Sequence, residues 1–386
     1  MASRVDVLLV LFVWFVLLNH NIEVDANWGL SRKEELRFKE QLTSLSTSAI
    51  RSIHEDGDVY DCIDFYKQPG FHHPFWKNTT FQMKRKLFME GLRNKTDLPL
   101  NIGLKDEGCP YGTVPIRRID KVEVNSDIEE EPGHHYAMLQ TKPDPNRKID
   151  GIESYFGTFN PKSIEGSQYS SFRMTLSNGD DSLKTGLTVN PLLFKDNKTR
   201  LFTHIVLNGR TQCFNQQCPG YIQLSSEIPL GWPVGKISVV GGRQASLKLR
   251  ISKDYMSTGP NSIESVWLLQ MDDDMLKVGL WPTKVFGRLN YLGNQADWGG
   301  EVYSPLDQPS PPMGTGIHPY GDTRYAAHSR LIGISYENSE SKFVNPGGAV
   351  LYESDPKSYS VFDSGYRTGY WGRLILYDGP GGIKSD

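Results

Sequence analysis

The stretch Ser182-Leu183-Lys184-Thr185-Gly186-Leu187-Thr188-Val189 alternates apolar and polar residues with a period of two. Successive side chains of a β-strand point to opposite faces, so this pattern predicts a strand that is buried on one side only. Lys184 and Thr188 then share the polar face, and the leucines and the valine share the other. A period of two also argues against an amphipathic helix here.

Short runs of the same kind follow one another from residue 133 onward, and Gly, Asn, Asp or Pro clusters separate them. The runs lie at 169–176, 200–207, 245–251, 265–270, 275–281 and 373–377. Many short strands with turn signals between them are typical of an all-β sandwich or barrel. None of the connections has the length and pattern of a crossover helix.

The region before these strands has a different character. Ser31 and Glu34 form a capping box, and apolar residues from Phe38 to Ile53 then recur at helical spacing, which predicts one helix. Residues 55–118 are rich in His, Pro and aromatic residues and are expected to be irregular. An acidic run ending at residue 131 is typical of a linker or a solvated loop. We therefore expect a mixed α/irregular N-terminal domain.

The first 26 residues indicate export. Arg4 precedes an apolar run from Val7 to Leu18, which is shorter than the roughly 20 residues that span a bilayer. Val24 and Ala26 fit the small-residue pattern of signal peptidase cleavage, so residues 1–26 are expected to be a signal peptide. We expect a secreted, extracellular protein without a membrane anchor after its removal. The net charge of −3 gives no reason to expect nucleic acid as a partner.

The chain has four cysteines, and an even number in an oxidising compartment predicts disulfides. Three pairings are possible. Cys213 and Cys218 enclose four residues and can close a local loop, which leaves Cys62 for Cys109. The spacing of Cys and His does not fit a zinc site, and no metal or other cofactor is expected.

Three Asn-x-Thr triplets, at Asn78, Asn94 and Asn197, are candidate glycosylation sites. Such triplets are common by chance. They have more weight here because the signal peptide directs the chain along the secretory route.

Several longer segments resemble the neprosin family. The block 61–69, with its continuation to residue 83, and the block 108–118 resemble that family's activation peptide. The segment from Cys213 to Tyr221 is similar to its short disulfide loop. Trp298-Gly299-Gly300-Glu301-Val302-Tyr303 resembles the segment that carries one catalytic glutamate. Residues 313–316 and 377–382 complete the set.

The resemblance implies a secreted plant glutamic peptidase that is made as a proenzyme. It implies a prodomain at 27–132 and, at 133–386, an antiparallel β-sandwich of two sheets. Two glutamates in a concave cleft would activate water and cleave peptides after proline. One carboxylate takes a proton from water, while a neighbouring carboxylic acid protonates the oxyanion or the leaving amine.

This chain departs from the family pattern at one of the two catalytic positions. Glu301 matches one glutamate, whereas Lys184 occupies the position of the other. Asp180 and Asp181 lie too far along the strand, at roughly 10–13 Å, to replace it. The family's cysteines near the carboxyl terminus are also missing.

We therefore expect a catalytically defective protein that acts in binding or regulation. Its ligands would be proline-rich peptides, cell-wall proteins or glycans in the apoplast or cell wall. The alternative is an active acid-pH prolyl endopeptidase that uses Glu301 with a modified partner. The competing structural interpretation of Glu301 is a carboxylate bound by backbone amides in a Gly-Gly turn.

Overall fold

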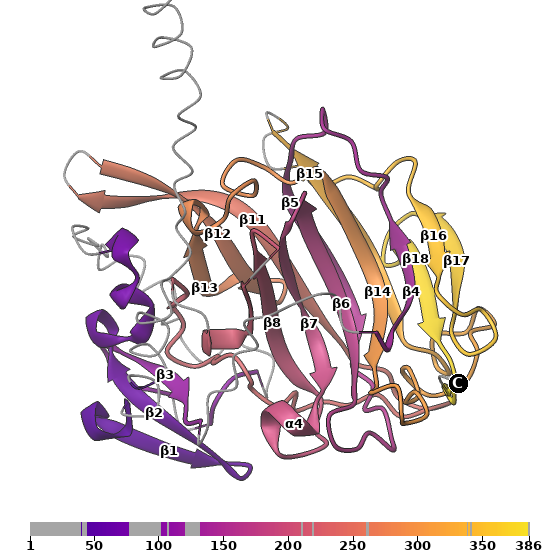
Figure 1. The fold of residues 1–386 in the computed structure, drawn as a ribbon, viewed down its shortest axis with the longest axis horizontal. Coiled ribbons are helices and arrows are strands. Elements are labelled where there is room, and N and C mark those ends of the chain that lie inside the picture. Colours follow the sequence, from indigo (N-terminus) through magenta and orange to yellow (C-terminus); the bar gives the residue numbers. More distant parts are fainter. Residues whose placement is uncertain are drawn as a thin grey trace, which may run out of the picture.

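The computed structural model describes residues 40, 45–76, 102–105, 108–119, 132–209, 211–217, 220–259, 262–337, 339 and 342–384. Within these ranges the strands form three antiparallel sheets. Two large sheets face each other as a sandwich, and a small N-terminal sheet lies at one end of it (Figure 1). The predicted all-β class is confirmed, and of the two architectures that the strand pattern allowed, the structure has the sandwich.

The first large sheet has seven strands in the order β16-β4-β14-β6-β7-β8-β9. Their bounds are β4 His134–Gln140, β6 Tyr169–Asn178, β7 Asp181–Val189, β8 Arg200–Leu207, β9 Thr211–Phe214, β14 Gln295–Tyr303 and β16 Val350–Glu353. The alternating stretch from Ser182 to Val189 lies in β7, between β6 and β8. It is one of the inner strands of the sheet, which agrees with its apolar face.

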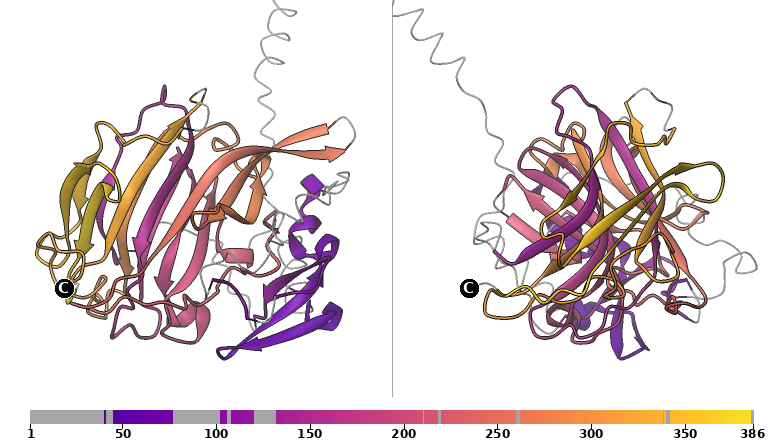
Figure 2. Two further views of the ribbon diagram at one scale, coloured as in Figure 1. Left: turned by 180° about the vertical axis from the view of Figure 1, so that it is seen from behind. Right: turned by 90° about the vertical axis from the view of Figure 1, so that its right-hand side faces the viewer.

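The second large sheet has eight strands in the order β10-β13-β12-β11-β5-β15-β18-β17. Their bounds are β5 Ile149–Gly157, β10 Ile222–Gln223, β11 Ser246–Gly259, β12 Ser262–Met271, β13 Leu276–Pro282, β15 His328–Tyr336, β17 Ser360–Arg367 and β18 Gly372–Asp378. The β11–β12 hairpin extends beyond the sandwich on the side of the N-terminal sheet (Figure 2).

The N-terminal sheet consists of β1 Arg51–Glu55, β2 Asp58–Asp64 and β3 Thr113–Arg117. The expected helix is therefore wrong at its carboxyl end, since 51–55 are a strand paired with β2; its start lies outside the described residues. The expectation that 55–118 is irregular is also wrong for β2 and β3.

The helical elements are short: η1 Leu45–Ser48, η2 Phe65–Lys67, η3 Pro69–His72, η4 Pro74–Trp76, α4 Pro191–Phe194, η5 Asn215–Gln217 and η6 Thr283–Val285.

The main core fills the space between the two large sheets. It takes the apolar face of each strand, such as Phe172 and Leu176 of β6 and Ile152 of β5, all of which are fully buried. Trp267 and Trp298 are also buried there. Each such side chain stabilises the fold by about 1.5–3 kcal/mol. The opposite face of the seven-stranded sheet is left for polar residues.

Some of the disulfides and glycosylation sites expected of a secreted protein can be located in the structure. Cys62 and Cys109 form the predicted disulfide. Cys213 is also disulfide-bonded, whereas its predicted partner Cys218 lies outside the described residues. Asn197 is exposed in the loop after α4. The signal peptide, Asn78 and Asn94 lie outside the described residues. Among the described residues, no helix is long and apolar enough to cross a membrane.

Candidate active site

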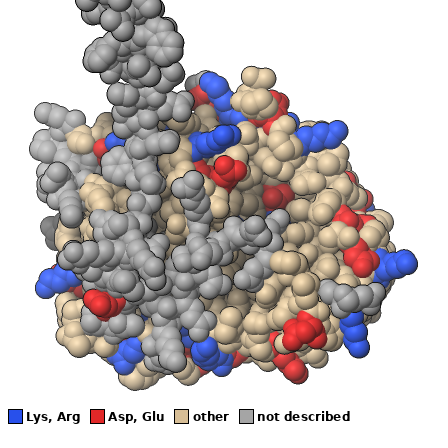
Figure 3. Space-filling model, viewed as in Figure 1, with Lys and Arg blue, Asp and Glu red and all other residues tan. Residues whose placement is uncertain are grey.

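A cleft of about 1070 Å³ lies on the outer face of the seven-stranded sheet. Its lining side chains come from β4, β6, β7, β8, β9, β14 and β16, and from turns next to them. Figure 3 shows that this face of the molecule is hollowed and that acidic and basic side chains lie around the hollow. The lining residues of β6, β7 and β14 alternate with core residues, so the period of two in the sequence determines which side chains enter the cleft.

The two residues singled out in the sequence meet in this cleft. Lys184 of β7 donates a hydrogen bond to Glu301 of β14, with Nζ 2.6 Å from Oε2. They are not direct neighbours, because β6 runs between their strands. In the register, Glu301 is level with Thr188, four residues beyond Lys184. The long side chain of Lys184 therefore extends diagonally across β6 to reach Glu301.

Arg173 of β6 lies between these two residues. Its cross-strand neighbours are Gly186 on β7 and Gly299 on β14. Neither neighbour has a side chain, so the guanidinium has room to reach along the sheet. Its Nε lies 2.8 Å from Oε2 of Glu301, and its Nη1 pairs with Asp297. Arg173 therefore links two carboxylates on the same face of β14.

The other oxygen of Glu301 is also engaged. The hydroxyl of Tyr169 donates to Oε1 at 2.6 Å, and Nδ1 of His134 lies 3.6 Å from the same oxygen. Burial alone would raise the pKa of Glu301, but Lys184, His134 and Arg173 hold the pKa well below its usual value. Glu301 is only 1% exposed. The site therefore contains a buried and ionised carboxylate with partners on both oxygens.

Neighbouring side chains respond to the same charges. Burial, and next Lys184, lower the pKa of His204 to about 3, so this histidine is neutral. Burial and the carboxylate of Glu301 raise the pKa of Tyr169 well above its usual value. Tyr169 therefore remains a hydrogen-bond donor and does not become a phenolate.

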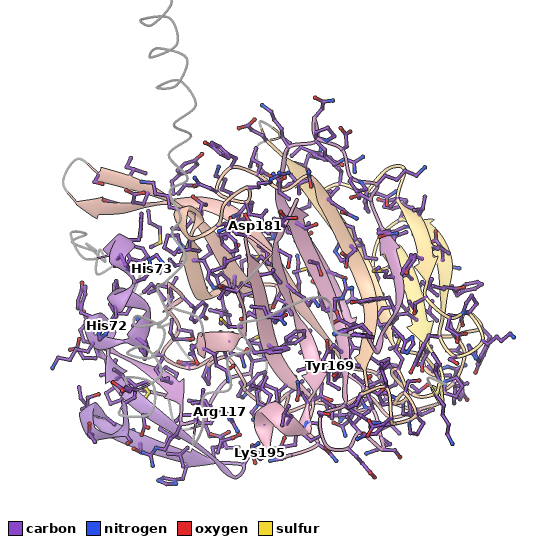
Figure 4. The ribbon with its side chains drawn as sticks, in the orientation of Figure 1. His72, His73, Arg117, Tyr169, Asp181 and Lys195 are labelled. Atoms are coloured by element: carbon purple, nitrogen blue, oxygen red, sulfur yellow. A yellow bond between two sulfur atoms is a disulfide. The ribbon has the colours of Figure 1, made fainter. Side chains whose placement is uncertain are left out.

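The aspartates considered from the sequence do not reach Glu301. Asp181 is buried and accepts hydrogen bonds from the backbone N–H groups of Asn208, Arg288 and Leu289. It lies toward the opposite end of the sheet from Tyr169 (Figure 4). Asp180 lines the cleft but is exposed in the turn between β6 and β7.

Sequence reasoning missed Arg173, Tyr169 and His134. The same alternation that places Lys184 would have found Arg173 and Tyr169, because both are in register with the polar positions of β6. The contact of His134 with Glu301 depends on β4 pairing with β14, and these segments lie far apart in the chain.

The arrangement limits the chemistry that the cleft can perform. A general acid must hold a proton at the working pH, and a general base must be free to accept one from water. Glu301 is held ionised by two cations, and both of its oxygens already accept hydrogen bonds. Among the described lining residues the other carboxylates are Asp180 and Asp297, and Asp297 pairs with Arg173. Among the described residues, no group of three or more His, Cys, Asp or Glu side chains could hold a metal ion.

The fold is thus an antiparallel two-sheet sandwich with a buried carboxylate in the cleft of one sheet. The chain matches the family description "Neprosin" over residues 166–380. It also matches "Neprosin activation peptide" over residues 50–147. The first match alone covers more than half of the chain, and the protein belongs to the neprosin family.

Solved structures with a similar arrangement include scytalido-glutamic peptidase with a transition state analog inhibitor. It has a TM-score of 0.33 and 10% identity, over 67% of this chain and 99% of that chain. Another is SCP-B, a member of the Eqolisin family of peptidases, in a complex with the tripeptide Ala-Ile-His. That match has a TM-score of 0.31 and 10% identity, over 66% of this chain and 98% of the other.

Proposed function

We propose that this protein is a catalytically defective member of its family that binds an extended ligand in the cleft. The observation that carries this proposal is the contact of 2.6 Å between Lys184 and Glu301. A glutamic peptidase needs two carboxyl groups at the scissile bond. Here an ammonium group occupies the position of one of them and neutralises the other. The cleft retains its volume and its polar lining, which are what binding requires.

The cleft favours ligands that offer flat or ring-shaped apolar surfaces. His134, Tyr136, Tyr169, Tyr303 and Tyr352 all line it. Tyr169 and Tyr303 are stacked with their ring centroids 5.7 Å apart, and His134 lies 4.8 Å from Tyr303. Aromatic rings of this kind stack on the pyrrolidine rings of proline and on sugar faces. Proline-rich wall peptides or glycans are therefore the proposed ligands.

Secretion to the apoplast or cell wall is part of this proposal. The Cys62–Cys109 bridge belongs to an oxidising compartment, and no free cysteine occurs among the described residues. Asn197 is exposed in its Asn-Lys-Thr triplet and is available for a glycan. The apolar N-terminal run supplies the export signal.

A binding measurement tests the ligand part of the proposal. A fluorescent proline-rich peptide and a labelled wall oligosaccharide are titrated with the purified protein, and anisotropy is recorded. Tyr352→Ala removes an aromatic ring at the cleft rim that is 41% exposed, and we expect it to weaken binding several-fold. Tyr291→Ala is the matched control, because Tyr291 is 73% exposed and does not line the cleft. Equal binding by both variants, or no binding by the wild type, would contradict the proposal.

A further inference from the structure

A second core lies on the outside of the sandwich. We call residues 45–76 and 102–118 the N-terminal module. Part of its buried apolar side chains forms a cluster with those on the outer face of the eight-stranded sheet, whereas Ile53, Tyr60, Cys62, Leu104 and Cys109 belong to the main core cluster. The cluster comprises Leu45, Ile63, Phe65, Trp76, Val114 and Ile116 of the module and Ile222, Met256, Val266, Leu268 and Leu280 of the sandwich.

The sandwich side of this cluster would be exposed without the module. Ile222, Val266 and Leu280 are fully buried, Leu268 is 3% exposed and Met256 is 7% exposed. They lie on β10, β11, β12 and β13, at one end of the sheet. Monomeric proteins rarely leave large contiguous apolar surfaces in water. The sandwich therefore depends on the module to cover this end of its outer face.

Buried polar groups also join the two parts. Gln68 Oε1 accepts a hydrogen bond from the backbone N–H of Gln223 at 2.7 Å, and its Nε2 donates to the carbonyl of Gln223 at 3.2 Å. Both side chains are at most 1% exposed. The backbone N–H of Leu104 donates to Glu227 O, and that of Cys109 donates to Ser226 O. Separation would leave these groups unpaired unless water entered the contact.

A buried ion-pair network crosses the same contact. Asp58 of β2 pairs with Arg200 of β8 at 2.6 Å and with Arg117 of β3 at 2.7 Å. Arg117 also donates to the carbonyl of Phe194 in α4. In Figure 4, Arg117 lies on the side of the module that faces α4. Arg200 is 1% exposed and also pairs with Asp196. Without the module, Asp196 alone would compensate its buried charge.

The backbones approach so closely that glycine is required. A Cβ at Gly70 would lie 1.8 Å from the carbonyl oxygen of Tyr221, and one at Gly108 would lie 2.3 Å from that of Ser226. Such approach is typical of a packed interior and not of a detachable cover.

The extent of the activation-peptide match supports the same conclusion. It continues to residue 147 and so includes β4, which is hydrogen-bonded between β14 and β16 in the seven-stranded sheet. His134 and Tyr136 of β4 line the cleft. Removal of the whole matched segment would delete a strand of the sandwich and part of the cleft wall.

We infer that the N-terminal module is a permanent layer of this fold and stays bound as a non-covalent subunit when its connection to the sandwich is cut. Every described residue that lines the cleft lies between 134 and 352, so the module contributes none of the described lining. The disulfide Cys62–Cys109 lies within the module and does not hold the two parts together. The contact therefore has to persist through packing, hydrogen bonds and ion pairs alone.

Cutting the folded full-length chain tests this inference. A site-specific protease sequence replaces residues 122–129, the purified protein is cut to completion, and the product is applied to a gel-filtration column at pH 7 without denaturant. We expect both fragments in one peak and a single thermal unfolding transition. A module that elutes separately would overturn the inference.

Two glycine variants test whether the close contact between Gly70 and Tyr221 retains the cut module. Gly70→Ala places a methyl group against Tyr221, and we expect it to lower the unfolding temperature of the uncut chain and to release the module from the cut one. Gly347→Ala is the matched control, because nothing lies within 4 Å of its added Cβ. Retention in Gly70→Ala equal to that in the control would contradict the assigned contact. The cut wild type decides the inference by itself if Gly70→Ala does not fold.

Discussion

Glu301 is the buried carboxylate on which the proposed loss of catalysis depends. A buried carboxylate is costly unless cations and hydrogen-bond donors compensate for its lost hydration. Lys184, Arg173 and Tyr169 supply that compensation here. The same contacts keep Glu301 ionised and occupy both of its carboxylate oxygens.

We predict that Glu301→Gln destabilises the protein by about 3 kcal/mol, at the low end of the range for breaking a buried pair, since Lys184 is partly exposed. The loss should depend on pH. The pKa of Glu301 is depressed in the folded state, so its contribution is complete above the unfolded pKa of about 4.3 and declines as pH falls below that value. Thermal unfolding of wild type and variant from pH 7 to pH 2 measures the difference.

The matched control for this prediction is Glu337→Gln. Glu337 pairs with Lys148 at 3.0 Å, but both side chains are largely exposed, and such pairs contribute about 0–1 kcal/mol. A stability difference between wild type and Glu301→Gln that widens toward acid pH would show that the carboxylate is not held ionised by its neighbours.

The end of β18 illustrates how single elements are fixed. The carboxylate of Asp378 is fully buried. Its hydrogen bonds connect the loop around residue 315 and the start of β15 to the end of the sheet. The donors are the backbone N–H groups of Thr315, Gly316, Ile317, Ala327 and Gly379 and the hydroxyl of Thr315. Asp378 belongs to the motif at 377–382, whose first two residues end the strand.

We predict that Asp378→Asn lowers the free energy of unfolding by about 2–4 kcal/mol. The amide group would direct its own hydrogens at backbone donors, and each unsatisfied buried group costs about 1–3 kcal/mol. Urea unfolding followed by tryptophan fluorescence measures the change. Asp307→Asn, at an exposed position in the loop after β14, should have little effect. Equal stability of the two variants would show that the clamp is not needed.

Strand elements were the most predictable part of this protein. A period of two identified β7 and set the side chains of Lys184 and Thr188 on the cleft face. Helical spacing of apolar residues predicted a helix up to Ile53, where the structure has β1. Short apolar runs fit both periods, and here pairing with β2 decided the outcome. Element type was thus set locally for β7 and by a tertiary partner for β1.

At the scale of the whole molecule, the sequence did not reveal that the module shares a core with the sandwich. A signal was present in β12, where Val266-Trp267-Leu268-Leu269 is a continuous apolar run. Such a run is expected for a strand buried on both faces. Trp267 and Leu269 face the main core, and Val266 and Leu268 face the module. The partner of the second face could not be inferred, because the module lies far away in the sequence.

We predict that Asp58→Asn lowers the stability of the whole chain by about 3 kcal/mol, because it leaves Arg200 and Arg117 without their shared carboxylate. Since the module and the sandwich share a core, one unfolding transition should move in calorimetry. Asp56→Asn, in the exposed turn before β2, is the control. Two separate transitions, of which only one moves, would show that module and sandwich unfold independently.

Peptide cleavage at acid pH decides whether the cleft is catalytically defective. Proline-containing peptides are incubated at pH 2–6 with wild type, Lys184→Glu, Glu301→Gln and the double variant, each checked for folding at the assay pH. We predict that the wild type does not exceed Glu301→Gln, whereas Lys184→Glu restores the second carboxyl and cleaves faster by about 10²–10⁴-fold, the usual contribution of an acid–base group. The double variant should be inactive. Cleavage by the wild type that disappears in Glu301→Gln would contradict the claim and indicate a working peptidase with a modified partner.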